Sequence, residues 1–325
     1  MKGTIPNFKR LIATYINRFN DADRKLVEKF VLEARVFDVS NPSMFWYLVK
    51  IKNIRFKYLK KGFTGCDKQD IKELVARINQ VDYSERTKDG YRFAIRKFFQ
   101  VIEGYEWTSK KFPQKVDWIK IKPPRRKKKY EILDKNDIEK MIASAKTLRN
   151  KTIVAILWEG GFRLGEFANI KISDISWDEY GCVIRVFGKT GFGSVRIVEY
   201  SGYLEMYLRK RKHDSEWVWT TEDNFSRGRK MSRKSIRAVL VKAGKMAGIT
   251  KPLNPQNFRT SSATYCSKFL TDAEMRIRFR WRWDSKMPSH YSWLSARDVD
   301  QKYISMFYPR KEVKIMNRTL KDFIV

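Results

Sequence analysis

Four side chains that together suit the cleavage of a phosphodiester bond occur in order along the second half of the chain: Arg163, Lys189, Arg259 and Tyr291. Arginines can hold the non-bridging oxygens of a phosphate through their planar forks. A lysine can protonate a hydroxyl leaving group, and a tyrosine hydroxyl can attack phosphorus and form a covalent link. Each residue is ordinary when read alone, since the chain has 69 basic residues and 15 tyrosines. Side chains of these types could together carry out transesterification of a nucleic-acid strand, and only the motifs around them single out these four.

No nucleotide, metal or other cofactor is expected for this chemistry. The turn Gly188–Thr190 lacks the upstream glycine of a phosphate-binding G-x-x-x-x-G-K-[ST] loop. The three cysteines are widely spaced and there are two histidines, so neither a disulfide framework nor a cysteine- or histidine-built metal centre is expected. Because the chain also shows no secretory signal and no membrane-length apolar run, we expect a cytoplasmic, nucleoid-associated protein.

The net charge indicates a polyanionic partner. The chain carries 69 Lys and Arg against 36 Asp and Glu, a formal charge of +33 at pH 7. A field of this sign attracts nucleic acid and opposes self-association. The basic residues are spread along all 325 residues, so we expect folded surfaces that follow a phosphate backbone. An anionic membrane surface or an acidic protein is the less common alternative.

A basic, proline-containing segment, KIKPPRRKKK at residues 120–129, divides the chain. Its two prolines disfavour helix. We interpret residues 121–129 as a linker between a helical DNA-binding domain (1–120) and a catalytic domain (130–325); a long surface loop within one domain is the alternative. The linker residues predicted to contact DNA are Arg125, Arg126, Lys127, Lys128 and Lys129.

Apolar periodicity predicts mainly α-helical structure with a small β-sheet or hairpin, an α+β fold. In the first half, helices are expected within residues 8–35, 70–78 and 84–105, and Arg92 and Arg96 of the last are predicted to contact DNA. In the second half, the expected elements are helices at 133–146 and 150–160, a helical turn at 163–169, a β-hairpin at 181–199 and helices from residue 232 onward.

Three segments, taken in order, resemble the catalytic domain of the tyrosine recombinases, the phage-integrase family. They are Gly161-Phe-Arg163-Leu-Gly-Glu166, the turn that contains Lys189, and Asn254-Pro-Gln256-Asn-Phe-Arg259-Thr-Ser-Ser-Ala-Thr264. Lys189 follows Arg163 by 26 residues, Arg259 follows Arg163 by 96, and Tyr291 follows Arg259 by 32. These spacings fit the family. The resemblance covers residues 130–308 with specific motifs and reaches the N-terminal part only in layout.

The resemblance implies site residues beyond the first four. Gln256 stands where the family usually has His or Lys, and Trp281 stands at its later His or Trp position. Either side chain can donate a hydrogen bond to a phosphate oxygen. Glutamine cannot move a proton near neutral pH, so this departure leaves general-base assistance open. Trp281 as ordinary core packing remains the alternative. Glu166 is expected to support Arg163 or a helix N-terminus.

Tyr291 is the predicted nucleophile because it follows a Met-Pro-x-x sequence at the family spacing. Tyr303 is the fallback, and Tyr308 is also close enough to compete. His290 is a less favoured candidate base, because neighbouring residues in a helix point apart.

Residues 281–300, WRWDSKMPSHYSWLSARDVD, resemble archaeal-type integrases, which carry Gly-Trp, then Ser-x-Met-Pro, then Tyr-x-His-Leu-Ser-x-x-Asp-Val. The implied activity is site-specific recombination through a 3′-phosphotyrosine intermediate, with integration or excision of a viral or plasmid genome in an archaeal host. The alternatives are a Xer-type resolvase of chromosome dimers and a non-cleaving DNA-binding relative. A topoisomerase-like enzyme and an RNA-binding protein are more distant alternatives.

The resemblance also implies partners. They are double-stranded DNA with a specific attachment site and three further copies of the chain in a synaptic homo-tetramer, formed from protein that is monomeric when free. Residues 297–307 show helical apolar spacing. In the family, such a helix docks on a neighbouring protomer.

Overall fold

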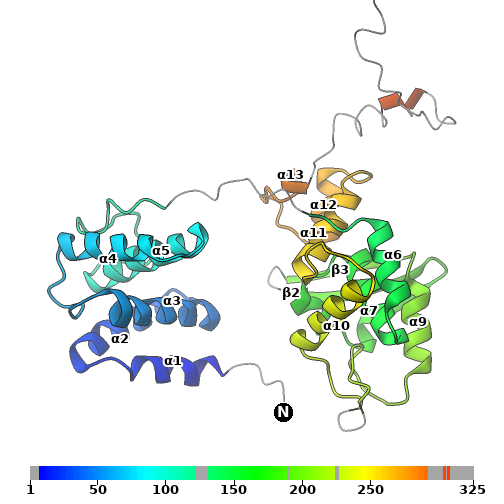
Figure 1. Cartoon of the computed structure of the whole chain (residues 1–325), viewed down its shortest axis with the longest axis horizontal. Coiled ribbons are helices and arrows are strands. Elements are labelled where there is room, and N and C mark those ends of the chain that lie inside the picture. Colours follow the sequence, from blue (N-terminus) through cyan, green and yellow to red (C-terminus); the bar gives the residue numbers. More distant parts are fainter. Residues whose placement is uncertain are drawn as a thin grey trace, which may run out of the picture. The chain divides into compact units, whose positions relative to one another are not determined.

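A computed structural model of the chain describes residues 7–121, 131–188, 191–223, 227–291, 303–304 and 306–307, with the backbone alone at 290 and 291. The chain divides into two compact units, Met1–Lys128 and Lys129–Val325; Figure 1 shows the elements of each. Within the described ranges, no helix is both long enough and apolar enough to cross a membrane.

The first unit is built from helices. They are α1 (Phe8–Ile16), α2 (Asp21–Val36), α3 (Asn41–Asn53), a π-helical turn η1 (Ile54–Tyr58), α4 (Lys68–Gln80) and α5 (Glu85–Ile102). Their apolar faces meet in an aromatic-rich core, in which the rings of Phe63 and Phe98 lie 4.6 Å apart. The expected helical stretch 8–35 is two helices, because Asn20 accepts a hydrogen bond from the Asp23 backbone and starts α2 anew.

The second unit contains the expected mixture of helices and a small sheet. Its elements are α6 (Lys135–Ser144), α7 (Leu148–Gly160), α8 (Leu164–Phe167), a 3₁₀ turn η2 (Ile172–Asp174), β1 (Ile175–Asp178), β2 (Gly181–Gly188), β3 (Gly191–Ile197), α9 (Ser201–Lys210), α10 (Arg233–Met246), α11 (Pro255–Cys266), α12 (Asp272–Phe279) and α13 (Pro288–Tyr291). The mainly α fold with a small sheet is therefore confirmed.

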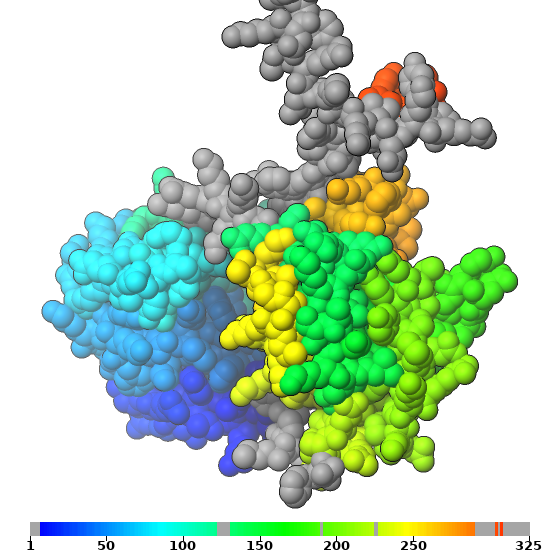
Figure 2. All heavy atoms as spheres, turned by 45° about the vertical axis from the view of Figure 1, so that its right-hand side comes forward, coloured from blue at the N-terminus to red at the C-terminus, as the bar shows by residue number. Residues whose placement is uncertain are grey.

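Helix α7 forms the centre of this unit. Its residues 152–158 are all buried, so it is apolar around its whole circumference. Helices α6, α9, α10 and α11 pack against it, as Figure 1 shows. In Figure 2, the yellow atoms of the α10 region lie directly against the green atoms of the α6–α7 region.

The sheet is antiparallel with strand order β1-β2-β3. The expected hairpin corresponds to β2 and β3, in which Phe187 lies opposite Phe192 and Gly188 opposite Gly191. Strand β1 was not expected from the sequence. It is four residues long and largely exposed, so it lacks the alternation of apolar and polar residues that marks a half-buried strand.

Candidate active site

The first candidate catalytic segment, which carries Arg163, is a tight turn between α7 and α8. Gly161 ends α7 in the left-handed conformation, at φ 52°, and a Cβ on this residue would lie 2.3 Å from the ring of Phe279. A glycine is required here by both the backbone angle and the space. Arg163 is the N-cap residue of α8, so the turn fixes the position of its backbone, from which the side chain extends.

Glu166 holds Arg163 in place. Its carboxylate accepts one hydrogen bond from the Arg163 guanidinium, at 2.7 Å, and one from the Arg163 backbone, at 3.1 Å. The sequence indicated that Glu166 supports Arg163 or a helix N-terminus, and in the structure it does both, since Arg163 is the N-cap of α8. The second carboxylate oxygen also accepts from Arg280, at 2.8 Å. Burial raises the pKa of the Glu166 carboxyl, but the charge of Arg280 and the contacts of Arg163 outweigh burial and hold this pKa below its usual value.

The second candidate catalytic segment is α11, which carries Gln256 and Arg259. Asn254 caps the helix by accepting from the Asn257 backbone, and Pro255 occupies its first position. Arg259, one turn further, is 3% exposed. Its guanidinium donates to the carbonyl oxygens of Gly161, at 2.5 Å, and of Phe279. Arg259 therefore ties the turn that carries Arg163 to the end of α12.

Trp281 follows directly from that end of α12. Its ring stacks on Phe279 with centroids 5.1 Å apart, and the Arg259 guanidinium lies 5.8 Å from its centroid. The indole is half-buried and lines an open pocket of about 390 Å³ together with Arg163, Arg282, Asp284, Ser285 and Met287. Trp281 thus packs on Phe279 and also lines the pocket beside Arg163. Core packing and a contact to phosphate, the two interpretations from the sequence, are therefore compatible.

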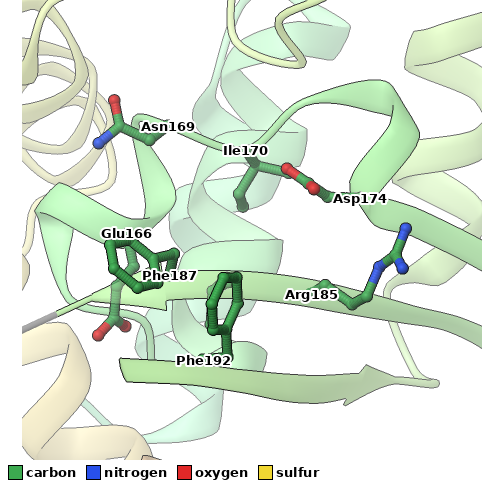
Figure 3. Close-up of a pocket in the computed structure, with 8 residues that line it drawn as sticks. Glu166, Asn169, Ile170, Asp174, Arg185, Phe187 and Phe192 are labelled. Carbon is green, nitrogen blue, oxygen red and sulfur yellow. The ribbon is translucent and has the colours of Figure 1, made fainter. Parts of the chain in front are cut away.

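The hairpin of β2 and β3 borders a second hollow of about 460 Å³ (Figure 3). Phe187 and Phe192 lie side by side across the two strands, with ring centroids 4.7 Å apart, and Glu166 enters from α8. Lys189, between the two strands in the sequence, lies outside the described residues.

The remaining predicted site residues are Gln256 and the candidate tyrosines. Gln256 is exposed in the first turn of α11, three residues before Arg259, which puts both on one side of the helix. Tyr291 is the last residue of α13, and its side chain, like that of His290, lies outside the described part. Tyr303 is 63% exposed and its ring contacts Phe307 at 5.2 Å. Tyr308 lies outside the described residues.

The residues predicted to contact DNA in the first unit have internal partners. Arg92 is 8% exposed and donates to Asp89, at 2.6 Å, and to Asn79, at 2.7 Å. The Arg96 guanidinium lies 3.9 Å from the ring centroid of Phe112. Both side chains thus support the helical unit, and DNA contact by them stays a prediction. The linker residues Arg125, Arg126, Lys127, Lys128 and Lys129 lie outside the described residues.

One site residue was missed from the sequence. Arg280 is buried between the two catalytic segments, and its backbone carbonyl accepts from the Arg163 guanidinium at 3.4 Å. A signal was present, since archaeal-type integrases carry glycine before this tryptophan and this chain carries arginine. The fold and the two phosphate-suited arginines define a DNA strand-transferase class of site.

The comparisons with known proteins agree with this class. A model of the phage integrase family matches residues 131–272. The chain is 27% identical over 214 residues to tyrosine recombinase XerA of Pyrococcus horikoshii, an alignment that covers 64% of this chain and 69% of the relative. It is 27% identical over 199 residues to tyrosine recombinase XerA of Thermococcus onnurineus, covering 59% of this chain and 65% of the relative. The matches thus span about two thirds of these relatives.

Solved structures show the same fold. The chain is similar to the XerH site-specific recombinase bound to a palindromic difH substrate, with a TM-score of 0.66 and 14% identity over 93% of this chain and 95% of that one. It is also similar to a lambda integrase dimer bound to a COC′ core site, with a TM-score of 0.65 and 16% identity over 94% of this chain and 80% of that one. Residues 131–272 thus match the phage integrase family, and the similarity to tyrosine recombinases supports site-specific DNA recombination as the class of activity.

Proposed function

We propose that this chain cleaves and rejoins DNA at a specific site through a 3′-phosphotyrosine intermediate, with Tyr291 as the nucleophile. The observation that carries the proposal is that Arg163 and Arg259, 96 residues apart in sequence, both donate hydrogen bonds to the segment Phe279–Trp281. Arg163 and Trp281 also line an open pocket. Guanidinium groups held in this way can bind the two non-bridging oxygens of a scissile phosphate and stabilise the charge that develops in the transition state.

The proposed step conserves atoms and charge. The Tyr291 oxygen forms a bond to phosphorus as its proton leaves to solvent or a nearby base, and the bond from phosphorus to the 5′-oxygen breaks. Lys189 gives a proton to that departing oxygen. Gln256 and Trp281 donate hydrogen bonds to the phosphate. The 5′-hydroxyl of a second strand reverses the step and releases the tyrosine, so neither a metal ion nor ATP is required.

We further propose residues 1–120 as the DNA-binding domain, residues 121–129 as a basic linker along the backbone and residues 130–325 as the catalytic domain. The charge of +33 supports contacts to DNA from both domains. A lambda integrase tetramer bound to a Holliday junction is among the similar structures, at 15% identity and a TM-score of 0.62. It supports a homo-tetrameric synaptic complex, formed from free monomers in the cytoplasm of the host cell.

The biological role we propose is integration or excision of a viral or plasmid genome in an archaeal host. Xer-type resolution of chromosome dimers is the second candidate, favoured by the matches to relatives named tyrosine recombinase XerA. The two roles differ in their targets. Capture of cleaved host DNA at a single chromosomal site without a matching site on a mobile element would favour the resolvase.

The cleavage proposal is tested with a nicked suicide substrate that traps the covalent adduct, in buffer that contains EDTA. We expect an adduct from the wild-type protein and none from Tyr291→Phe, which should bind the same DNA with unchanged affinity. Tyr303→Phe is the matched control and should form the adduct at the wild-type level. Adduct formation by Tyr291→Phe, or loss of the adduct in EDTA, would overturn the assignment.

A further inference from the structure

Arg280 combines two properties that rarely occur together in one residue. Its backbone is in the left-handed region, at φ 53° and ψ 49°, which favours glycine over any residue with a side chain. Its side chain is also a buried cation, with the residue 9% exposed. Burial of a charge is unfavourable unless it is paired. The cost of the backbone conformation and the cost of burying the guanidinium must therefore both be offset by a favourable contact.

That contact is made with Glu166. The Arg280 guanidinium donates to Glu166 Oε2 at 2.8 Å, with 6% and 3% of the two side chains exposed. The same carboxylate pairs with Arg163 through its other oxygen, at 2.7 Å. One negative charge is therefore shared by two positive charges, and the group of three side chains has a net charge of +1.

The arrangement bears directly on Arg163. A carboxylate paired with a single arginine cancels the charge of that arginine, which weakens its attraction for an anion. Because Arg280 takes up one oxygen of Glu166, Arg163 is oriented by the carboxylate and keeps its charge available to a phosphate. The 31% exposure of the Arg163 side chain is consistent with this use.

Strands β2 and β3 pack closely against the Glu166–Arg280 ion pair. A Cβ at Gly188 would lie 2.5 Å from Glu166 Oε1, and a Cβ at Gly193 would lie 2.6 Å from Arg280 Cδ. The two strands of the hairpin thus rest on the ion pair at glycines, and their backbones shield it from water. Exclusion of water strengthens the interaction between the charges.

We propose that Arg280 is a positioning residue for DNA cleavage, which balances the charge of Glu166 so that Arg163 is oriented by the carboxylate and still presents positive charge to the scissile phosphate. This inference rests on the proposed function. It predicts that loss of Arg280 slows the chemical step in a protein that still folds and binds DNA with nearly unchanged affinity.

The first test compares cleavage rates of the full chain on a suicide substrate. We expect Arg280→Gly, which suits the backbone angle, to slow adduct formation by about 10- to 100-fold. Arg280→Lys, which keeps the charge without the planar fork, should recover part of the rate. Arg278→Gln is the matched control, because Arg278 donates to the Glu159 carbonyl at 2.8 Å; it should cleave at the wild-type rate. The melting temperature and DNA affinity of each variant are measured alongside.

The second test asks whether the effect passes through Glu166 and Arg163. In a Glu166→Gln background, Arg280→Gly should change the rate by less than about threefold, because no charge remains to be balanced. With a methylphosphonate at the scissile position, which lacks the negative charge that Arg163 would bind, the Arg280→Gly defect should shrink at least about tenfold.

The proposal would be overturned by a wild-type cleavage rate in Arg280→Gly, by an equal defect in the Glu166→Gln background, or by an equal defect on the methylphosphonate. Rescue instead by a 5′-bridging phosphorothiolate, whose thiol leaving group needs no proton, would also overturn it, because Arg280 would then act on leaving-group protonation. Failure of the proposed function is distinguishable, since in that case the wild-type protein itself would form no adduct.

Discussion

The two units of the chain use buried arginines in different ways. In the first unit, Arg92 is held by the Asp89 carboxylate and by the Asn79 amide oxygen, and Arg55 is held by the buried carboxylate of Asp23. In the second unit, Arg259 is more deeply buried, yet its guanidinium donates to two backbone carbonyl oxygens. Arg92 is thus fixed by a negative group and Arg259 by neutral groups, whereas Arg280 of the second unit pairs with the Glu166 carboxylate.

The difference teaches what each arginine is suited to do. A carboxylate partner orients a guanidinium and cancels its charge, which stabilises a fold and leaves little attraction for an anion. Carbonyl oxygens orient it and leave the charge in place. Arg163 also keeps positive charge, although its partner is a carboxylate. The reason is that Glu166 pairs with Arg280 as well as with Arg163. The second unit therefore presents oriented positive charge, as stabilisation of a cleaving phosphate requires.

The largest effect is expected from Arg259→Ala, which tests the second unit through the rate of DNA cleavage. Loss of an oriented cation that acts on the transition state should slow adduct formation by about 10²- to 10³-fold. DNA affinity should fall only a few-fold, because the chain has many other basic residues that can contact the backbone. Rates on a suicide substrate and affinities by fluorescence anisotropy check both. An equal loss of affinity and rate would make Arg259 an ordinary backbone contact.

A smaller effect, on stability and not on the cleavage rate, is expected from Arg92→Ala. Removal of a guanidinium that pairs with Asp89 inside the helical unit should lower the free energy of unfolding by about 1–3 kcal/mol, as measured with urea. The adduct rate at saturating DNA should not change. The salt dependence of DNA affinity sharpens the comparison, because a logarithmic slope reduced by about 0.9 would show that Arg92 also contacts a phosphate.

The smallest effect is a pH dependence that Glu166 contributes. The pKa of its carboxyl lies below the usual value, despite burial, because of Arg280 and Arg163. The ionised group therefore stabilises the folded protein above its unfolded-state pKa of about 4.3, and this contribution is lost as the pH falls through the lower folded-state pKa. Urea unfolding at pH 7 and in acid should show a larger loss for the wild type than for Glu166→Gln. Equal losses would mean that the ion pairs add no net stability.

Features with local signals could be predicted from the sequence. The start of α11 follows from Asn254 and Pro255, the start of α5 from Ser84, and the hairpin from strands that flank a glycine-rich turn. The order of Arg163 and Arg259 indicated that they act together, and the structure brings both onto the segment Phe279–Trp281.

Features that depend on distant residues could not. The role of Arg280 arises from a contact with Glu166, 114 residues away in the sequence, and no periodicity or cap announces such a pair. Strand β1 is defined by its pairing with β2, since its own residues are largely exposed. The internal use of Arg92 likewise depends on Asn79 in the preceding helix, which only the packing of α4 on α5 brings near.

The most direct test of the account is covalent capture from a mixed DNA pool. The protein is incubated with supercoiled plasmid and genomic DNA in EDTA without ATP and quenched with SDS, and the linked DNA ends and the modified peptide are sequenced. The account predicts 3′ ends attached through Tyr291 and clustered on one sequence. No adduct, despite tight and salt-sensitive DNA binding, would contradict it and identify the chain as a relative that binds without cutting.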